Sequence, residues 1–143
     1  MKSIQEIQEE IIDDFKSIGD GFEQYAYLIE LACLQPPLPE EQRAEEHLVA
    51  GCISNVWLHM YSEENRFFLR GDSNTLIIKG ILYLLEKILN GQPLPAVAGS
   101  TLFFLEETSV MDTFETSRRK GMKAVLTEIK AFADKAMNGG NGD

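Results

Sequence analysis

The chain has 143 residues, 44% of them hydrophobic and 25% charged, which is typical of one compact soluble domain. Its 13 basic and 23 acidic residues give a net charge of −10, which argues against nucleic acids and anionic membrane surfaces as partners. The charge is uneven, because residues 1–46 carry 12 acidic and three basic side chains. The first residues lack the apolar core of a secretory signal, and no apolar stretch could span a membrane, so we expect a cytoplasmic protein.

Two amphipathic helices are predicted before the first proline-rich segment. Ser3 and Glu6 form a capping-box pattern, and apolar residues at helical spacing predict a helix over residues 4–17. A second pattern of the same period predicts another helix over residues 22–33. Residues 35–46 contain three prolines and four glutamates, so we expect a surface loop there.

A β-hairpin is predicted next, because the apolar period changes from helical spacing to alternation. Residues 53–61 alternate as a strand packed on both faces would, residues 62–65 form a polar turn, and residues 66–70 form a second strand. Residues 47–50 could add a third short strand. We therefore expect a small antiparallel sheet of about three strands.

The strongest apolar helix is predicted directly after this hairpin. It runs over residues 74–90, with Asp72 or Ser73 as its N-cap, and its apolar residues extend almost all the way round. Pro93 and Pro95 then mark a loop.

The C-terminal part is predicted to hold one or two helical turns over residues 102–107 and a last helix that begins near Thr116 or Ser117. Residues 1–137 are expected to form a single domain and residues 138–143 a disordered tail. Helices, then a small sheet, then more helices predict an α+β fold with the helices packed on one face of the sheet.

Cys52 is the strongest candidate for chemistry. It follows Gly51 between two β-patterned segments, which predicts a tight loop that carries the thiol, because Gly51 can adopt a positive φ angle. The alternative is a buried structural cysteine, since free cysteines are often buried. Cys33 lies on the apolar stripe of the second predicted helix and is expected in the core, and both thiols are expected to be free.

The other candidates are basic residues. Arg118, Arg119 and Lys120 open the last predicted helix, where cations oppose the helix dipole, and such a broken local rule often marks a functional position. The alternative is a solvated patch offset by Glu115.

Two histidines also lie near Cys52 in the sequence. His47 or His59 could act as the base of a Cys–His dyad in a small thiol hydrolase or acyltransferase, although no third orienting group stands out. The alternative is surface or strand packing. The cysteine and histidine spacings fit neither a zinc site nor a cluster scaffold, so we expect no metal and no cofactor.

Three segments, in this order and at this spacing, resemble the SufE family of sulfur-acceptor proteins. They are GCISNVWL at residues 51–58, RGDSNTLIIKGIL at 70–82 and SRRKGM at 117–122. The resemblance extends from about residue 15 to residue 129. The chain has GDSNT where the family usually has GDSDA, and SRRKGM where SRSxGL is usual.

The resemblance implies a SufE/IscU-like fold and a role in iron–sulfur cluster assembly. Cys52 would accept sulfane sulfur from a SufS-like, pyridoxal-phosphate-dependent cysteine desulfurase, stimulate that enzyme, and pass the sulfur to a SufBCD-like scaffold. Arg118 matches the family's arginine and could contact the thiolate, the persulfide or the partner. On this reading the chain is a sulfur carrier and not an enzyme. A docking module that regulates a desulfurase without sulfur chemistry of its own, and a small Cys–His thiol enzyme, remain the alternatives.

Overall fold

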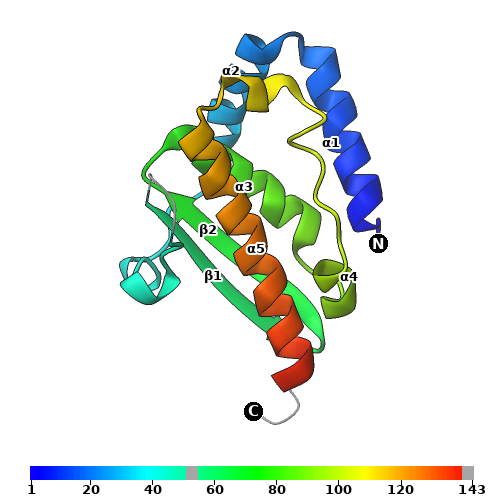
Figure 1. Ribbon diagram of the computed structural model, residues 1–143, viewed down its shortest axis with the longest axis vertical. Coiled ribbons are helices and arrows are strands. Elements are labelled where there is room, and N and C mark those ends of the chain that lie inside the picture. Colours follow the sequence, from blue (N-terminus) through cyan, green and yellow to red (C-terminus); the bar gives the residue numbers. More distant parts are fainter. Residues whose placement is uncertain (51–54, 140–143) are drawn as a thin grey trace.

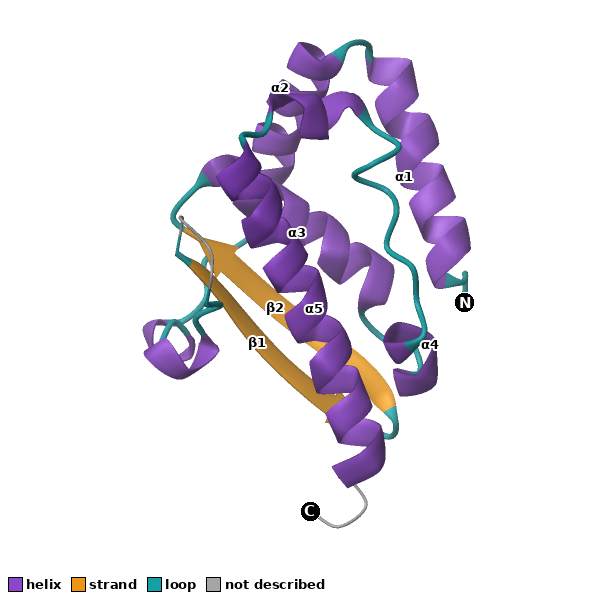
Figure 2. Ribbon diagram, in the orientation of Figure 1, coloured by secondary structure: helices purple, strands orange, loops and turns teal. Residues whose placement is uncertain are grey.

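The computed structural model describes residues 1–50 and 55–139, which form helices around one antiparallel hairpin (Figure 1; Figure 2). The α-helices are α1 (Ile4–Ile18), α2 (Gly21–Ala32), α3 (Leu76–Leu89), α4 (Leu94–Ala98) and α5 (Thr116–Gly139). The strands are β1 (Val56–Glu63) and β2 (Arg66–Ser73). Short 3₁₀ turns occur at Glu40–Gln42, Glu45–His47 and Ser109–Thr113. The predicted α+β class is confirmed.

The hairpin is tight and regular. β1 and β2 pair from Val56 opposite Ser73 to Glu63 opposite Arg66. The two residues between the strands, Glu64 and Asn65, have φ angles of 53° and 65°, as a two-residue turn of the type that matches strand twist requires. The predicted hairpin is therefore confirmed, and its second strand is three residues longer than the sequence indicated.

Helices cover one face of this sheet. Phe67 and Gly71 point to the same face because they are four residues apart in one strand. The ring of Phe67 lies 6.0 Å from that of Phe132 in α5, and Gly71 lies against Leu82 in α3. Both helices thus pack on the face that also carries Leu69, as predicted, and the core lies between this face and the helices.

The backbone groups on the outer edge of β2 have hydrogen-bond partners at three residues. The backbone N–H of Phe67 donates to the Gln92 carbonyl at 2.9 Å, and Leu69 exchanges two hydrogen bonds with the Asn90 side chain. Gly71 donates to the carboxylate of Glu86 at 2.9 Å. The carbonyl of Gly71 accepts from the Gln35 amide at 3.2 Å, so partners from α3, the turn after it and the segment after α2 occupy this edge, which cannot accept another strand.

Buried glutamines tie the long segment between α4 and α5 to the N-terminal helices. Gln8 is fully buried, and its side chain donates to the carbonyl of Thr101 and accepts from the N–H groups of Phe103 and Phe104. Gln24 accepts from the N–H of Ser109 at 2.8 Å. These amides replace the regular hydrogen bonds that the segment lacks.

Several sequence predictions about the sheet and its neighbours are wrong. The predicted third strand at residues 47–50 is a 3₁₀ turn followed by a single bridge from Leu48 to Trp57, so the described residues form a two-stranded sheet. Thr75, and not Asp72 or Ser73, precedes the first turn of α3, because β2 continues through both of those residues.

Four further predictions need correction outside the sheet. Residues 102–107 form turns and no helix, whereas the predicted loop at Pro93 and Pro95 contains α4. Cys33 follows the last turn of α2 and is exposed rather than buried in the core. α5 continues to Gly139, so residues 138 and 139 belong to a helix rather than to the predicted tail, and residues 140–143 lie outside the described part. Over the described ranges, no helix combines the length and apolarity that crossing a membrane would require.

α2 and α3 approach each other closely at Gly80. Gly80 in α3 faces the backbone of Leu28 in α2, and both residues lie in the core. A Cβ atom on Gly80 would lie 2.9 Å from the carbonyl carbon of Leu28 and nearer still to its oxygen. Only a residue without a side chain permits this separation.

We expect Gly80→Ala to lower the free energy of unfolding by about 2–3 kcal/mol, because the helices must move apart against backbone atoms. Urea denaturation at equilibrium measures the change. Gly99→Ala is the matched control, since its Cβ would meet one atom, the Pro95 carbonyl oxygen, at 3.3 Å. Equal effects of the two substitutions would contradict the argument.

Candidate functional site

Cys52, the predicted site residue, lies in residues 51–54, outside the described part of the chain. The residues on either side of that segment are described and are joined to each other. The N–H of Val49 donates to the carbonyl of Val56 at 2.8 Å, and Leu48 bridges to Trp57. Val49 and Val56, which lie on either side of the segment, are therefore held next to each other, and both are buried.

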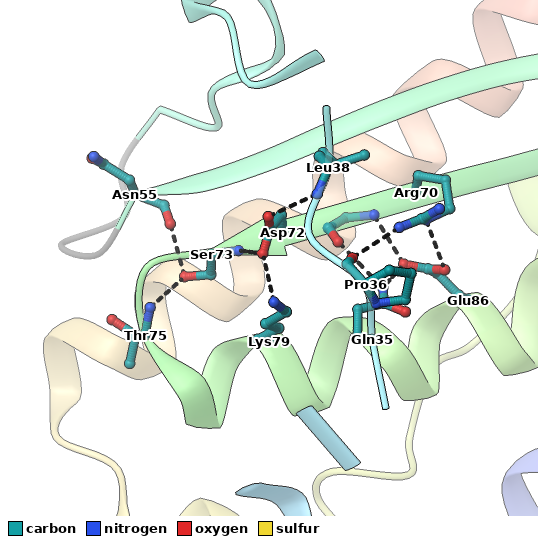
Figure 3. Close-up of polar contacts among 11 residues, drawn as sticks. Gln35, Pro36, Leu38, Asn55, Arg70, Asp72, Ser73, Thr75, Lys79 and Glu86 are labelled. Atoms are coloured by element: carbon teal, nitrogen blue, oxygen red, sulfur yellow. Dashed lines mark hydrogen bonds and ion pairs between the residues drawn. The ribbon is translucent and has the colours of Figure 1, made fainter. Parts of the chain in front are cut away.

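Asn55, which follows the segment directly, is held by the end of β2 (Figure 3). The hydroxyl of Ser73 donates to the Asn55 carbonyl at 2.7 Å, and the Asn55 N–H donates to the side-chain oxygen of Asn74 at 3.2 Å. Ser73 in turn accepts the N–H of Thr75 at 3.2 Å. The start of β1 is thereby fixed to the connection between β2 and α3.

The carboxylate of Asp72 is the buried centre of this region, with 2% of the residue exposed. It accepts the backbone N–H of Leu38 at 3.0 Å and that of Ser73 at 2.8 Å, and it lies 3.5 Å from the ammonium of Lys79 in α3. A buried carboxylate requires such partners, because burial without them is costly. Asp72 therefore joins the loop before residue 40, the end of β2 and α3 (Figure 3).

A second carboxylate, that of the partly buried Glu86 in α3, has a similar set of partners two helical turns after Lys79. It accepts the N–H of Gly71 at 2.9 Å and a hydrogen bond from the amide of Gln35, and lies 3.5 Å from the guanidinium of Arg70. Burial raises the pKa of Glu86, while the bonds from Gly71 and Gln35 and the charge of Arg70 oppose that rise. Arg70 also donates to the carbonyl of Pro36 at 3.1 Å, which fixes the proline-rich segment over the sheet.

The cations at the start of α5 have different environments. Figures 1 and 3 both draw the first turns of α5 beside the connection from β2 to α3. Arg119 donates to the carbonyl of Met111 at 2.7 Å and to that of Phe114 at 3.3 Å. Arg118 is half-buried, and its guanidinium lies 5.7 Å from the centre of the Phe114 ring. Arg119 thus caps the preceding turn, whereas the described residues give Arg118 no ion pair.

The two histidines lie together on the outer face of the sheet. Their ring centres are 5.1 Å apart, and His59 is also 5.8 Å from the Tyr61 ring. Burial, together with the nearby His47 and Arg70, lowers the pKa of His59 and favours its neutral form. Its Nδ1 atom is buried without a hydrogen-bond partner in the described structure. The predicted Cys–His dyad includes Cys52, which lies outside the described residues, so it stays a prediction.

The sequence analysis assigned Asp72 to a helix cap and so missed its buried ion pair with Lys79. It also gave no role to Gln35 or Asn55. Asp72 and Lys79 lie seven residues apart, on either side of the predicted start of α3, and their opposite charges could have suggested an ion pair. The need for that pair follows from the burial of Asp72 beneath Leu38, whose N–H it accepts, and this contact depends on the tertiary structure. Within residues 1–50 and 55–139, no three side chains of the metal-binding types come together.

The fold and this site define a small α+β domain in which one helix-covered hairpin fixes the residues that flank a short cysteine-containing segment. Residues 9–133 match the family model described as "SufE: Fe-S metabolism associated domain". The chain therefore belongs to the SufE family, which associates it with iron–sulfur metabolism.

Relatives from other organisms agree with this assignment. An uncharacterized SufE-like protein of Rhizobium etli is 30% identical over 130 residues, which cover 87% of this chain and 88% of that protein. Another from Rhizobium meliloti is 27% identical over 131 residues, covering 88% and 94% of the two chains. The solution structure of a hypothetical protein from Thermus thermophilus shares the fold, with a TM-score of 0.75 and 23% identity over 92% of this chain and 96% of that one.

We expect Asp72→Asn to lower the free energy of unfolding by about 3 kcal/mol, because it leaves the ammonium of Lys79 without its counter-charge in a mostly buried position. Urea denaturation measures the loss. The double variant Asp72→Asn with Lys79→Met should recover most of the stability, since the asparagine oxygen can still accept the Leu38 N–H. A single variant within 1 kcal/mol of the parent, on the scale of an exposed pair, would refute the buried pairing.

Proposed function

We propose that the protein is a persulfide carrier that accepts sulfane sulfur on Cys52 from a pyridoxal-phosphate-dependent cysteine desulfurase. It stimulates the desulfurase by removing this sulfur and delivers it to an iron–sulfur cluster assembly scaffold. Membership of the SufE family is the observation that carries the proposal. The position of Cys52 between two ends that hydrogen bonds hold in place, at Val49 and Asn55, supports it.

The proposed reaction is thiol–disulfide exchange in which one sulfur carries hydrogen instead of carbon. The thiolate of Cys52 attacks the outer sulfur of the desulfurase persulfide, and a new S–S bond forms as the old one breaks. The desulfurase cysteine leaves as a thiolate, and its former outer sulfur, with its hydrogen, stays on Cys52 as a persulfide. No electrons are gained or lost overall, so no external oxidant or reductant is needed.

This reaction demands little from the carrier beyond one accessible nucleophile. The desulfurase performs the carbon–sulfur cleavage with its own cofactor. What the carrier must supply is a thiol presented at a defined place. The hydrogen bond that Asn55 accepts from Ser73 and the one that it donates to Asn74 supply such a reference point at one end of the segment. The cation of Arg118 is proposed to contact the thiolate, the persulfide or the docked partner.

The decisive experiment compares the two cysteines. The protein is incubated with a cysteine desulfurase and cysteine, and its intact mass is measured before and after reduction. The parent should gain one sulfur atom that reductant removes, Cys52→Ser should gain none and lose the stimulation of the desulfurase, and Cys33→Ser should behave as the parent. Cys33 is a suitable control because it is a free, exposed thiol.

Two other outcomes would contradict the proposal in different ways. Stimulation that survives Cys52→Ser would identify a docking module that regulates the desulfurase without sulfur chemistry. Turnover of a thioester or other acyl substrate without any desulfurase, lost in Cys52→Ser, would identify a thiol enzyme.

We expect Arg118→Ala to slow sulfur uptake about tenfold, the effect of losing one contact worth ~1.4 kcal/mol in the transition state. Its unfolding free energy should stay close to that of the parent, because the described residues give this side chain only the contact with Phe114. Arg119→Ala is the matched control and should do the reverse, losing about 1 kcal/mol of stability with its hydrogen bonds to the Met111 and Phe114 carbonyls while keeping the uptake rate. Single-turnover transfer at saturating desulfurase measures the rate.

A further inference from the structure

A groove runs along the outer edge of β1, on the opposite side of the hairpin from the covered edge of β2. It has a volume of about 290 Å³. Leu48 and Val49 form one wall, Glu128 and Phe132 of α5 form the other, and Leu58 and Met60 of β1 lie along its floor. We refer to this feature as the edge groove.

The backbone of β1 is open in the edge groove. In an antiparallel pair, successive residues direct their N–H and C=O groups alternately toward and away from the partner strand. The outward residues of β2 are Phe67, Leu69 and Gly71, so their opposite residues in β1, Ser62, Met60 and Leu58, also point outward. Among the described residues, no hydrogen bond satisfies the outward groups of Met60 and Ser62.

The chain itself already begins to occupy this edge. Leu48 bridges to Trp57 in antiparallel orientation, and the Val49 N–H donates to the Val56 carbonyl at 2.8 Å. That pairing includes only the first two residues of β1, because the chain before Leu48 turns away into the 3₁₀ turn Glu45–His47. The edge groove therefore lies where a third strand would continue, if the pairing of Leu48 and Val49 extended further along β1.

The charges at the edge groove select its occupant. Glu46 lies on the wall beside Leu48 and Glu128 on α5, and both residues are exposed. A second copy of this chain would bring like carboxylates together and carries the same net charge of −10. A peptide with basic side chains would place opposite charges against both glutamates, while small apolar side chains between them would contact Leu58, Met60 and Phe132.

We propose that the edge groove binds an extended, basic peptide segment of a partner protein, which adds to the sheet as a strand alongside Leu58, Met60 and Ser62. The backbone hydrogen bonds supply the binding and the two glutamates select the charge. This surface is independent of the sulfur chemistry proposed for Cys52, so Cys52→Ser should bind the peptide as the parent does.

A synthetic peptide of sequence KVTVKVTVK, blocked at both ends, tests the proposal by titration into isotopically labelled protein. Amide resonances of Met60 and Ser62 should shift, and their hydrogen exchange should slow at least about tenfold when peptide saturates the site, because new hydrogen bonds cover them. Glu128→Lys should weaken binding about tenfold and higher salt should weaken it further. Glu107→Lys, which reverses an exposed charge outside the groove, should leave binding within about twofold of the parent.

Two modified peptides separate strand addition from simple charge attraction. N-methylation of every second residue removes the N–H groups on one edge of the peptide only, so methylation of one set should abolish binding and methylation of the other set should preserve it. A peptide with glutamate in place of each lysine should not bind at millimolar concentration.

Four results would overturn the proposal. They are no binding of the lysine peptide, equal binding of the glutamate peptide, binding of both N-methylated forms, and slowed exchange at Met60 and Ser62 that rises with protein concentration in the absence of peptide. The last result would assign the edge to a second copy of this chain. Because Glu128 is exposed, Glu128→Lys should keep the parent's unfolding temperature. Its amide spectrum without peptide should also resemble that of the parent, which shows that any weaker binding does not come from unfolding.

Discussion

The buried carboxylate of Asp72 is the constraint on which the arrangement of the site depends. It lies at the end of β2, accepts the N–H of Leu38 from a loop more than thirty residues earlier, and neutralises Lys79 of α3. An aspartate with 2% exposure must keep these partners, because an unpaired buried charge would cost several kcal/mol. The proline-rich loop, the strand and the helix are therefore fixed together next to Ser73, which in turn fixes Asn55.

The described residues form a sheet of two strands, which has little backbone pairing of its own. Hydrogen bonds from outside the sheet add to this pairing mainly along the edge of β2. The outer edge of β2 is closed by Gln92, Asn90 and Glu86, each of which serves one outward residue. The outer edge of β1 receives Val49 and Leu48 and then stays open beside α5. Exposed strand edges carry a risk of unwanted pairing, and the glutamates beside this edge limit that risk by repelling further copies of an acidic chain.

Much of the fold was predictable because it rests on local patterns. The capping box at Ser3 and Glu6 forms with both of its hydrogen bonds, and the alternation before the turn at Glu64 gave the hairpin. The failures arise where a distant partner decides. Asp72 before a helix looks like a cap, and only Leu38 makes it a buried strand residue. The third strand at residues 47–50 was predicted from its composition, but the chain turns at His47 and leaves a single bridge. The candidate site residue, Cys52, was predicted from its sequence motif, and it lies outside the described residues.

The two neighbouring arginines show how little of a site can be inferred from charge alone. Arg118 and Arg119 are adjacent in a sequence pattern that suggests one basic patch, yet the helical turn separates their side chains by about 100°. That rotation directs Arg119 to the backbone carbonyls of Met111 and Phe114, and it leaves Arg118 against the Phe114 ring. A guanidinium over an aromatic ring keeps its donors available, whereas one bonded to carbonyls has used them. For the proposed contact with a thiolate or an acidic partner surface, Arg118 is the better candidate of the two, and the structure gives a physical reason for the preference that the sequence resemblance alone suggested.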